Sequence, residues 1–457
     1  MNNFSCILCV KIIFVKYGPL FTNVIFSVIM SFMLDIKFIK ENPDIIKEAA
    51  RKKHSNFKVE ELLEAEGDRV FLIKEVDDMR AKQNGMNAKI SGTSDMKERN
   101  DFIYEMKLLK DELQKKETRL EEVMKKWRSL MVQVPNVPDM SVPDGESDAD
   151  NKEIKVWGEV TKFDFTPKNH FDLLMDLDMA DLERGTKVSG FRGYFLKNDG
   201  FMLSMAIWQF CLDLLVKKGY SPLLAPALVK KEPFYGTGYL PQGEEDLYKT
   251  QDADYLAGTA EVGTMGFYMD ETLPKELLPK KFVSFSPCFR REAGSHGKDT
   301  KGLIRLHEFY KVEQVILCEA SHEESVKFHE EIRENSEEIM QKLGIPYRVV
   351  INCGGDLGQG QVKKYDIEAW VPGENKYRET HSISYFHDFQ TRRLNTRYKD
   401  TDGKVKFAHS LNGTALATPR ALVALVENFQ NKDGSITIPE VLRPYMGGRS
   451  AIERPNK

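Results

Sequence analysis

Two long apolar stripes near the start of the chain constrain its fold more than any other feature of the sequence. Apolar residues recur every three or four positions from Val59 to Ile90, and a second stripe runs from Phe102 to Leu130. Only the short polar segment 91–95 stands between two helical patterns of similar length, which predicts an antiparallel coiled-coil hairpin. Its outer faces are dense in charged residues. They suit a solvated surface, a dimer contact, or an arm that touches an extended polymer such as RNA.

The segment after the hairpin has a different composition. Residues 134–154 contain three prolines and many acidic residues, so they predict neither a helix nor a central strand. We interpret them as a linker between an N-terminal domain, residues 33–133, and a larger domain, residues 155–457. A chain of 457 residues is too long for one ordinary core, which agrees with this division.

The first 32 residues are predicted to lie outside both domains. An apolar run from Leu20 to Leu34 follows Lys11 and Lys16, as in a signal sequence or a short anchor. The run is shorter than the ~20 residues of a membrane-spanning helix, and an amphipathic helix pattern begins directly after Met33. We therefore favour residues 1–32 as upstream translated sequence, and we expect a cytoplasmic protein with no membrane partner.

The pattern of the larger domain predicts an α+β fold. A helix is expected from about Ser204 to Lys218, with Gly219 after its end. Extended runs joined by turns rather than crossover helices indicate an antiparallel sheet flanked by helices. These runs are 220–228, 281–289, 302–317, 347–352, 364–370, 381–387 and 405–411. The six scattered cysteines predict no disulfide framework, and a net charge of −4 does not by itself indicate a nucleic-acid partner.

The segment CFRREAGSHGKDTKGLIRLHEFYKVE, residues 288–313, combines charged and aromatic residues. If it forms strand, loop and strand, Arg290 and Glu292 share one face of the first strand. The return strand would bring to that face Arg305, His307, Phe309, Lys311 and Glu313. Guanidinium, carboxylate and aromatic groups together suit a ligand with a phosphate, an amine and a flat base. An edge hairpin with ordinary cross-strand ion pairs is the alternative.

Two further segments carry matching chemistry. In GTAE, extended geometry would place Thr259 and Glu261 on one face. In YRETHSIS, Glu379 precedes Ser382 by three residues, and both offer oxygen atoms to a hard cation such as Mg²⁺. GGDLGQG, residues 354–360, lacks the Lys-Ser/Thr pair of a phosphate loop and is interpreted as a turn.

The segment LNGTALATPRALVALVENFQ predicts an anion site at the start of a buried helix. Thr418 is predicted as the N-cap and Pro419 as the first helical residue. Arg420 would then lie in the first turn, where a helix N-terminus and a guanidinium both attract an anion. The helix beyond it is apolar nearly all round, so it is predicted to be buried.

Taken in this order, the segments resemble the class II aminoacyl-tRNA synthetases, and their details are similar to the seryl-tRNA synthetase family. The resemblance runs from about Met33 to the end of the chain. LLAPALV, around Pro226, is similar to motif 1 of the class, residues 289–313 to motif 2, and GTALATPRALVALVENFQ to motif 3. TAE, VPNVPD after a helical hairpin, KKYDIEAWVPG and DFQTRRLNTRY are typical of the seryl branch.

The resemblance implies a serine–tRNA ligase that works in two steps. Serine and ATP would give seryl-adenylate and pyrophosphate, and the seryl group would then pass to the 3′ end of tRNA(Ser), with tRNA(Sec) as a further substrate where it exists. The resemblance also implies Mg²⁺ as cofactor, tRNA(Ser) binding through the coiled-coil arm, and a homodimer formed through the motif 1 region.

The resemblance further implies a role for each matched residue. The serine site would contain Thr259, Ala260, Glu261, Arg290, Glu313, Asn412 and Thr414. The ATP site would contain Arg290, Arg291, Glu292, Leu306, Phe309, Glu379, Thr380, His381, Ser382 and Arg420. Glu313 would bind the serine amine, and Phe309 and Arg420 would stack on adenine. Arg290, Glu292 and Arg420 would be catalytic. Glu379 and Ser382 would hold the metal.

Three positions depart from residues common in the family: Thr380, His381 and Tyr385. They leave the backbone path at the triphosphate open. A catalytically inactive RNA-binding relative and a ligase for another small amino acid remain as alternatives. The charged residues that an inactive relative would be expected to lose are all present, which favours an active enzyme.

Overall fold

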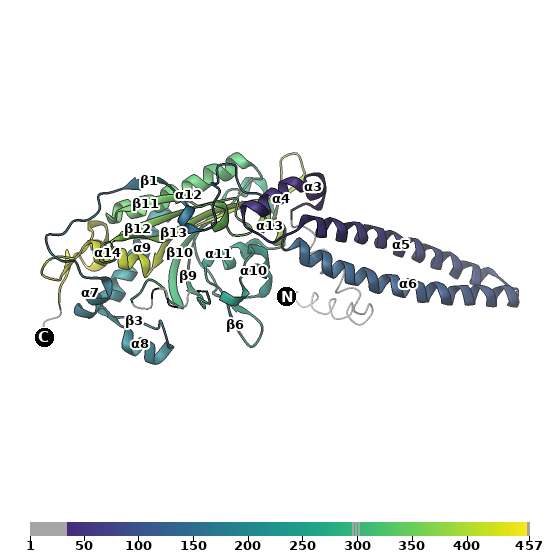
Figure 1. The fold of residues 1–457 in the computed structure, drawn as a ribbon, viewed down its shortest axis with the longest axis horizontal. Helices are drawn as coiled ribbons and strands as arrows, with labels where there is room; N and C mark the ends of the chain where they lie inside the picture. Colours follow the sequence, from purple (N-terminus) through teal and green to yellow (C-terminus); the bar gives the residue numbers. More distant parts are fainter. Residues whose placement is uncertain (1–33, 295–296, 298, 300–301, 455–457) are drawn as a thin grey trace, which may run out of the picture. The chain divides into compact units, whose positions relative to one another are not determined.

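The computed structural model describes residues 34–294, 297, 299 and 302–454 (Figure 1). These residues form two compact units, one of residues 34–135 and one of residues 136–454. The predicted leader, residues 1–32, lies outside the described residues.

The N-terminal unit is a long helical hairpin preceded by two short helices. Helix α3 spans Ile36–Glu41, α4 spans Pro43–Lys52, α5 spans Val59–Gly92 and α6 spans Met96–Met131. Three residues, 93–95, connect the long helices. Asp95 caps α6, because its side chain accepts hydrogen bonds from the backbone N–H groups of Lys97 and Glu98.

An apolar seam holds the two long helices together. Val76, Met79 and Leu113 are buried in it. Lys116 interrupts the second apolar stripe and pairs with Glu75 across the seam, with Nζ 2.6 Å from Oε2. A partly exposed ion pair contributes only about 0–1 kcal/mol, so the apolar contacts stabilise the hairpin and the ion pair mainly favours one register.

The second unit is built on an eight-stranded sheet of order β1-β11-β12-β13-β16-β10-β9-β4. Its strands are β1 Lys152–Trp157, β4 Ser221–Leu224, β9 Lys280–Phe289, β10 Glu308–Cys318, β11 Tyr347–Ile351, β12 Lys363–Val371, β13 Lys376–His387 and β16 His409–Thr418. All neighbours are antiparallel except β4 and β9, which pair in parallel. The predicted α+β class with an antiparallel sheet is confirmed, with this one parallel pair at an edge.

Helices and short strands surround the sheet. The helices are α7 His170–Asp176, α8 Leu182–Ser189, α9 Asn198–Lys217, α10 Lys231–Thr237, α11 Ala260–Met265, α12 His322–Leu343, α13 Phe389–Arg393 and α14 Arg420–Asn428. The short strands are β2 Ala180–Asp181, β3 Phe195–Leu196, β5 Leu228–Val229, β6 Tyr248–Lys249, β7 Tyr255–Leu256, β8 Thr272–Pro274, β14 Arg397–Lys399, β15 Val405–Phe407, β17 Ile436–Thr437 and β18 Ala451–Ile452.

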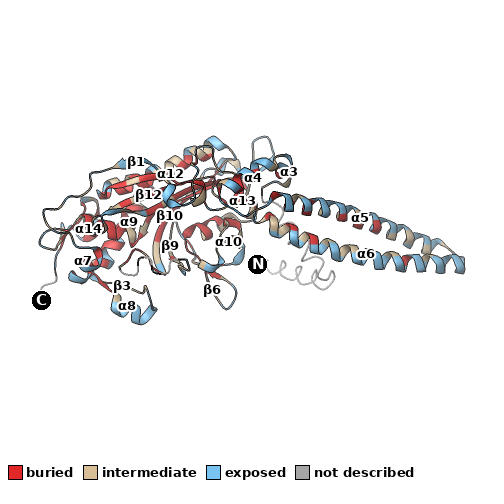
Figure 2. Ribbon diagram, viewed as in Figure 1, coloured by how far each residue is buried: buried red, intermediate tan, exposed pale blue. Residues whose placement is uncertain are grey.

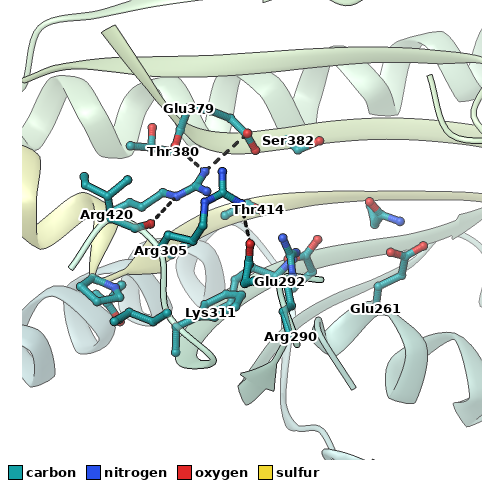
Figure 3. Close-up of a pocket in the computed structure, with 18 of the residues that line it drawn as sticks. Glu261, Arg290, Glu292, Arg305, Lys311, Glu379, Thr380, Ser382, Thr414 and Arg420 are labelled. Carbon is teal, nitrogen blue, oxygen red and sulfur yellow. Dashed lines mark hydrogen bonds and ion pairs between the residues drawn. The ribbon is translucent and has the colours of Figure 1, made fainter. Parts of the chain in front are cut away.

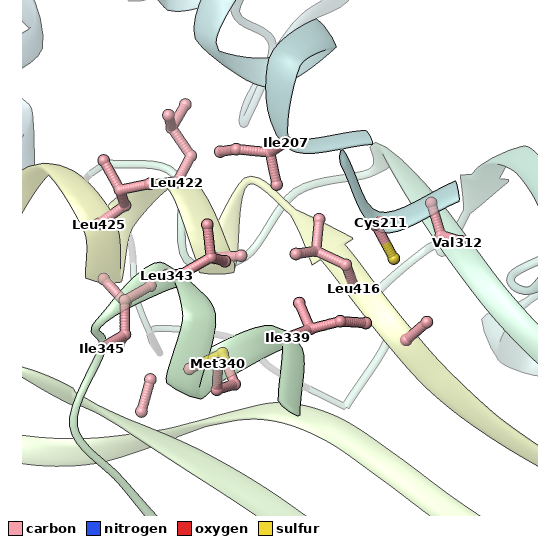
Figure 4. Close-up of a cluster of buried hydrophobic side chains, with 14 of the residues drawn as sticks. Ile207, Cys211, Val312, Ile339, Met340, Leu343, Ile345, Leu416, Leu422 and Leu425 are labelled. Atoms are coloured by element: carbon pink, nitrogen blue, oxygen red, sulfur yellow. The ribbon is translucent and has the colours of Figure 1, made fainter. Parts of the chain in front are cut away.

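The two faces of the large sheet differ in chemistry. Side chains alternate between the faces of a strand, so in β10 Val312 belongs to the apolar core while Glu313 lines a polar cavity on the other face. Helices α9, α12 and α14 cover the core face, where Ile207, Leu343 and Leu422 gather (Figure 4). Figure 2 shows that burial concentrates in the strands and in the helix faces turned toward them. The opposite, more polar face bears Glu313 and the cavity, together with a smaller apolar cluster that includes Val315 and Leu317.

Among the described residues, α9 alone is long and apolar enough to span a membrane, and half of its most apolar window is buried in this unit. A core helix passes the same test of length and composition.

Helix α9 begins at Asn198 rather than near Ser204, so the predicted start was wrong. Asn and Gly are weak helix formers, but Gly200 is required here because a Cβ would lie 2.2 Å from the carbonyl oxygen of Met179.

From Asn136 on, the segment predicted as a linker is part of the second unit and packs against the rest of it. The side-chain amide of Asn136 donates hydrogen bonds to the carbonyl oxygens of Gly360 and Phe386, at 2.9 and 2.8 Å, and Val142 is buried. Strand β1 begins within it and pairs with β11 at the edge of the sheet. A proline-rich segment can therefore be ordered without an α-helix when its polar groups find individual partners.

Candidate active site

A cavity opens on the polar face of the sheet, where β10, β13 and β16 are neighbours (Figure 3). Predicted site residues come together in its wall from several distant segments of the chain. They are Glu261, Arg290, Glu292, Leu306, Phe309, Glu313, Glu379, Thr380, Ser382, Asn412, Thr414 and Arg420.

The predicted hairpin is present but its strands are shorter than expected. Strand β10 pairs with β9 from Glu308 opposite Phe289 to Leu317 opposite Lys280. The strand prediction for 302–307 was wrong. There Gly302 has a φ of +81°, a conformation that interrupts a strand and favours glycine, and apolar side chains of this loop are buried.

The residues that follow β9 and precede β10 meet at the open end of this hairpin because the chain forms loops there. The Arg290 guanidinium carbon lies 5.3 Å from the centre of the Phe309 ring, and Arg305 Nη1 donates to Glu292 Oε2 at 2.5 Å. His307 does not line the cavity, and its Nδ1 lies 3.0 Å from the Arg290 carbonyl oxygen. One end of the cavity thus offers guanidinium groups beside an aromatic ring, which suits an anionic ligand with a flat group.

The other end of the cavity holds a buried charge cluster. Glu261, Lys311 and Glu313 are 5%, 6% and 2% exposed, and the Lys311 ammonium pairs with the Glu313 carboxylate. Glu261 accepts hydrogen bonds from the Tyr239 hydroxyl at 2.9 Å and from Gln390 Nε2 at 2.7 Å. Burial, and then the charge of Glu313, raise the pKa of Glu261 to about 7. Two carboxylates face one ammonium, so the cluster can accept a further cation.

Glu261 reaches this cluster from a helix rather than a strand. Thr259 is the N-cap of α11, and its Oγ1 accepts a hydrogen bond from the backbone N–H of Glu261 at 3.2 Å. The prediction of extended geometry was therefore wrong, because the threonine hydroxyl caps the helix. Thr259 and Ala260 are buried and do not line the cavity.

A β-bulge brings Glu379 and Ser382 to the same cavity. Residues three apart on a regular strand point to opposite faces. The register of β12 and β13 pairs Ile367 with His381 and Glu368 with Glu379, so Thr380 is the extra residue of a bulge. His381 points to the core instead: it is 1% exposed, and its Nε2 lies 3.0 Å from the Ala415 carbonyl oxygen.

Arg420 spans the cavity wall between two segments (Figure 3). Its Nε donates to the Ile304 carbonyl oxygen at 3.2 Å and its Nη1 to the Glu379 carbonyl oxygen at 2.8 Å. Nη1 also lies 3.4 Å from Glu379 Oε2. Desolvation by the cavity walls acts to raise the pKa of Glu379, whose side chain is about half exposed, but the charges of Arg420, Lys364 and Arg290 together outweigh it and the pKa is lowered. Glu379 therefore stays ionised at neutral pH.

The start of α14 differs from the prediction by one residue. Thr418 is the last residue of β16 and Pro419 is the N-cap of α14, which begins at Arg420. Thr418 was predicted as the N-cap, but its hydroxyl accepts a hydrogen bond from Trp208 Nε1 at 2.8 Å and donates to the Tyr310 carbonyl oxygen at 3.2 Å. The predicted burial of the helix is confirmed over residues 421–428.

The structure does not bring every predicted residue to the cavity, and it adds others. Arg291, His381, Thr259 and Ala260 lie outside the lining. The lining also includes Tyr239, Arg305, Lys311, Gln361 and Ser384. Strand alternation predicted that Arg305 and Lys311 share a face of the hairpin with Arg290, but it assigned neither residue a role in a site. Tyr239 and Gln361 come from loops with no periodic pattern, so no sequence signal identified them.

Glu379 and Ser382 fit a divalent cation that is shared with a phosphate ligand. No cluster of three or more His, Cys, Asp or Glu side chains able to hold a metal occurs among the described residues. Mg²⁺ rarely needs one, because it usually takes one or two carboxylates and completes its shell with water and substrate phosphates. The ionised Glu379 beside the Ser382 hydroxyl has that composition.

Comparison with known proteins first defines the class of this fold and site. Residues 247–429 match the tRNA synthetase class II core domain (G, H, P, S and T), which makes the second unit a class II synthetase core. Residues 33–138 match the seryl-tRNA synthetase N-terminal domain.

Individual relatives define the family within that class. A serine–tRNA ligase of Deinococcus radiodurans is 46% identical over 424 residues, covering 93% of this chain and all of the relative. That of Thermodesulfovibrio yellowstonii is 45% identical over 91% of this chain and 99% of the relative. The seryl-tRNA synthetase of Pyrococcus horikoshii complexed with ATP superposes with a TM-score of 0.85 at 39% identity, covering 93% of this chain and all of that one. The chain belongs to the seryl-tRNA synthetase family, which confirms the resemblance found in its sequence.

Proposed function

We propose that this chain is a serine–tRNA ligase, which activates L-serine with ATP and transfers the seryl group to tRNA(Ser). The observation that carries the proposal is a single cavity that joins a buried pair of carboxylates to an arginine-rich end beside an aromatic ring. The relatives named serine–tRNA ligase support the same activity.

The amino-acid end would recognise serine by charge and by its hydroxyl. Lys311 neutralises only one of the two carboxylates Glu261 and Glu313, so the ammonium of serine would complete the charge balance that a buried site requires. Asn412 Nδ2 is buried and makes no hydrogen bond within the described residues. A serine hydroxyl would satisfy this donor, with Thr414 beside it in the lining. Alanine would leave the donor unpaired, which costs affinity.

The arginine-rich end would bind ATP and promote adenylate formation. In that step a serine carboxylate oxygen forms a bond to the α-phosphorus, the bond from that phosphorus to the bridging oxygen breaks, and pyrophosphate leaves. Two anions must approach each other, so Arg290 and Arg420 would offset their charge and hold them in line. Glu292 would lie at the adenine end, where Phe309 would stack on the base. In the second step the tRNA 3′-terminal hydroxyl attacks the seryl carbonyl carbon and AMP leaves.

Mg²⁺ would be held by Glu379 and Ser382. When bound, it would supply positive charge at the phosphates of ATP. The lowered pKa of Glu379 suits this role, because a carboxylate must be ionised to bind a hard cation.

The remaining parts of the chain support the proposed macromolecular partners. The helical hairpin α5–α6, in the region that matches the family's N-terminal domain, would bind tRNA(Ser), and tRNA(Sec) where it exists. Helix α9 in the motif 1 region exposes 49% of Phe201 and 43% of Met205. Contiguous apolar surface of this kind favours burial by a second subunit, so we propose a homodimer through this helix, with the arm of one subunit serving the site of the other. We propose a cytoplasmic location.

Serine-dependent exchange of pyrophosphate into ATP tests the activity directly. We expect exchange with serine, and at most a few per cent of that rate with alanine, threonine or cysteine. Faster exchange with another small amino acid would identify a different ligase. No exchange with any amino acid, from protein that melts cooperatively, would identify an inactive relative.

A further inference from the structure

A buried carboxylate lies next to the strand that carries Glu379 and Ser382. Asp366, in the middle of β12, is 6% exposed. Its Oδ2 accepts a hydrogen bond of 2.6 Å from Asn352 Nδ2, and Lys364 Nζ lies 3.5 Å from the same oxygen. Its Oδ1 is buried and makes no hydrogen bond within the described residues. A buried carboxylate oxygen without a partner costs stability, so it requires an explanation.

Strand register places this oxygen beside the candidate cation site. Asp366 is the direct cross-strand partner of Ser382. Directly opposed residues of antiparallel strands point to the same face, with Cβ atoms about 4.5–5.5 Å apart. The neighbours Tyr365 and Ile367 belong to the core on the other face. Ser382 lines the cavity, and its hydroxyl makes no hydrogen bond within the described part of the chain.

The glycine-rich segment 354–360 fixes the other side of Asp366. Asp356 accepts hydrogen bonds from Asn352 Nδ2 at 2.7 Å and from Asn151 Nδ2 at 2.8 Å, and it lies 3.5 Å from Lys364 Nζ. The Asn352 amide is therefore held with its NH₂ group between two carboxylates, and that group engages Asp366 Oδ2. The glycine-rich segment therefore holds this buried network in place and does not form a phosphate-binding loop.

We propose that Asp366 is a positioning residue for the cation site, and that its Oδ1 accepts the hydroxyl hydrogen of Ser382 when a divalent cation binds. The inference rests on the proposed function, in which Glu379 and Ser382 hold Mg²⁺. A hydroxyl group that ligates a cation must direct its hydrogen away from the metal. An acceptor behind it fixes that orientation and makes the oxygen a better ligand, as partners of metal ligands generally do. The ammonium of Lys364 offsets part of the negative charge that Asp366 brings to the cation site.

The variant Asp366→Asn tests this polarity at nearly constant volume. Asn352 presents an NH₂ group to position 366, so the new amide would turn its oxygen to Asn352 and its NH₂ to Ser382. The Ser382 hydroxyl would then have to accept rather than donate, which removes a lone pair from the cation. We measure Mn²⁺ affinity by electron paramagnetic resonance, on the full chain with a non-hydrolysable ATP analogue, and expect roughly 10-fold weaker binding.

Matched variants separate this role from general damage to the network. Asp356→Asn makes the same chemical change within the network but away from Ser382, and we expect less than about a threefold change. Because Asp366 is proposed to act through Ser382, Asp366→Asn should have no further effect in a Ser382→Ala background. Equal effects of Asp366→Asn with and without Ser382 would overturn the proposal, and so would wild-type affinity in the single variant.

Failure of the proposed cation site gives a different result. If Ser382→Ala binds Mn²⁺ as tightly as the wild type, the assignment of Ser382 is wrong and the role of Asp366 falls with it, while serine-dependent exchange still reports the activity. If Asp366→Asn does not fold, a crystal structure of the wild-type protein with Mg²⁺ and the ATP analogue decides. We expect Ser382 Oγ within about 3.0 Å of Asp366 Oδ1, and a separation above about 3.5 Å would overturn the proposal.

Discussion

Replacing Arg420 with alanine should abolish most adenylate formation while leaving the fold intact. The side chain is 26% exposed and ties two segments together through hydrogen bonds to the carbonyl oxygens of Ile304 and Glu379. Both carbonyl groups lie beside the open cavity, where water can replace the guanidinium. We therefore expect the free energy of unfolding to fall by about 1–3 kcal/mol, or about 0.5–1.5 kcal/mol for each hydrogen bond.

The effect on catalysis should be larger than the effect on stability. A preorganised donor at the position where charge develops contributes about 2.7–4 kcal/mol to the transition state. Its loss should lower the rate of pyrophosphate exchange by about 10²–10³-fold. Arg420→Lys keeps the charge but loses the planar fork, so we expect a rate between those of the wild type and Arg420→Ala.

The assay is serine-dependent pyrophosphate exchange at saturating serine and varied ATP, with a thermal melt of each variant. Arg348→Ala is the matched control. That arginine is also partly exposed and ion-paired, with Nε 2.6 Å from Glu368 Oε2, but it lies on β11 away from the cavity. It should exchange at nearly the wild-type rate. Exchange by folded Arg420→Ala within threefold of the wild type would refute the role of Arg420.

Three further predictions follow from the site and the two units. Glu261 has a pKa raised to about 7 and must be ionised to complement an ammonium, so serine affinity should weaken about tenfold from pH 8 to pH 6. The variant Glu261→Gln should lose this pH dependence. Calorimetry that shows no change in affinity between these pH values would contradict the prediction. Removal of residues 59–130 should leave the rate of pyrophosphate exchange within about threefold of the wild type, since the cavity lies wholly in the second unit. It should lower tRNA(Ser) charging at least tenfold. Equal loss of both activities would count against a separable arm. Met205→Asp should shift the protein from dimer to monomer in analytical ultracentrifugation, because a charge would be buried at the proposed interface. An unchanged mass would place the interface elsewhere.

Periodic features of the structure could be predicted from sequence. The two arm helices follow from apolar stripes at helical spacing, and the sheet follows from short extended runs joined by turns. Both patterns report which side of an element is buried, which is what hydrophobic spacing encodes. The common location of Phe309, Lys311 and Glu313 on β10 was predictable for the same reason, because strand alternation puts side chains two residues apart on one face.

Features that depend on tertiary contacts could not be predicted in this way. The bulge at Thr380 leaves no periodic signal, yet it decides that Ser382 lines the cavity while His381 is buried. Thr418 has the right residue type for an N-cap, but a hydrogen bond from Trp208 on a distant helix engages its hydroxyl. Tyr239 reaches the site from a loop. In each case the decisive partner is remote in sequence, so local patterns carry no information about it.

Aminoacylation of purified tRNA(Ser) is the most direct measurement of the central claim. Full-length protein, ATP, Mg²⁺ and each of the 20 amino acids in turn would be incubated with tRNA(Ser), and the esterified amino acid identified by mass spectrometry. We predict serine on the 3′ end of tRNA(Ser). Charging with a different amino acid, or no charging by protein that forms seryl-adenylate, would contradict the account.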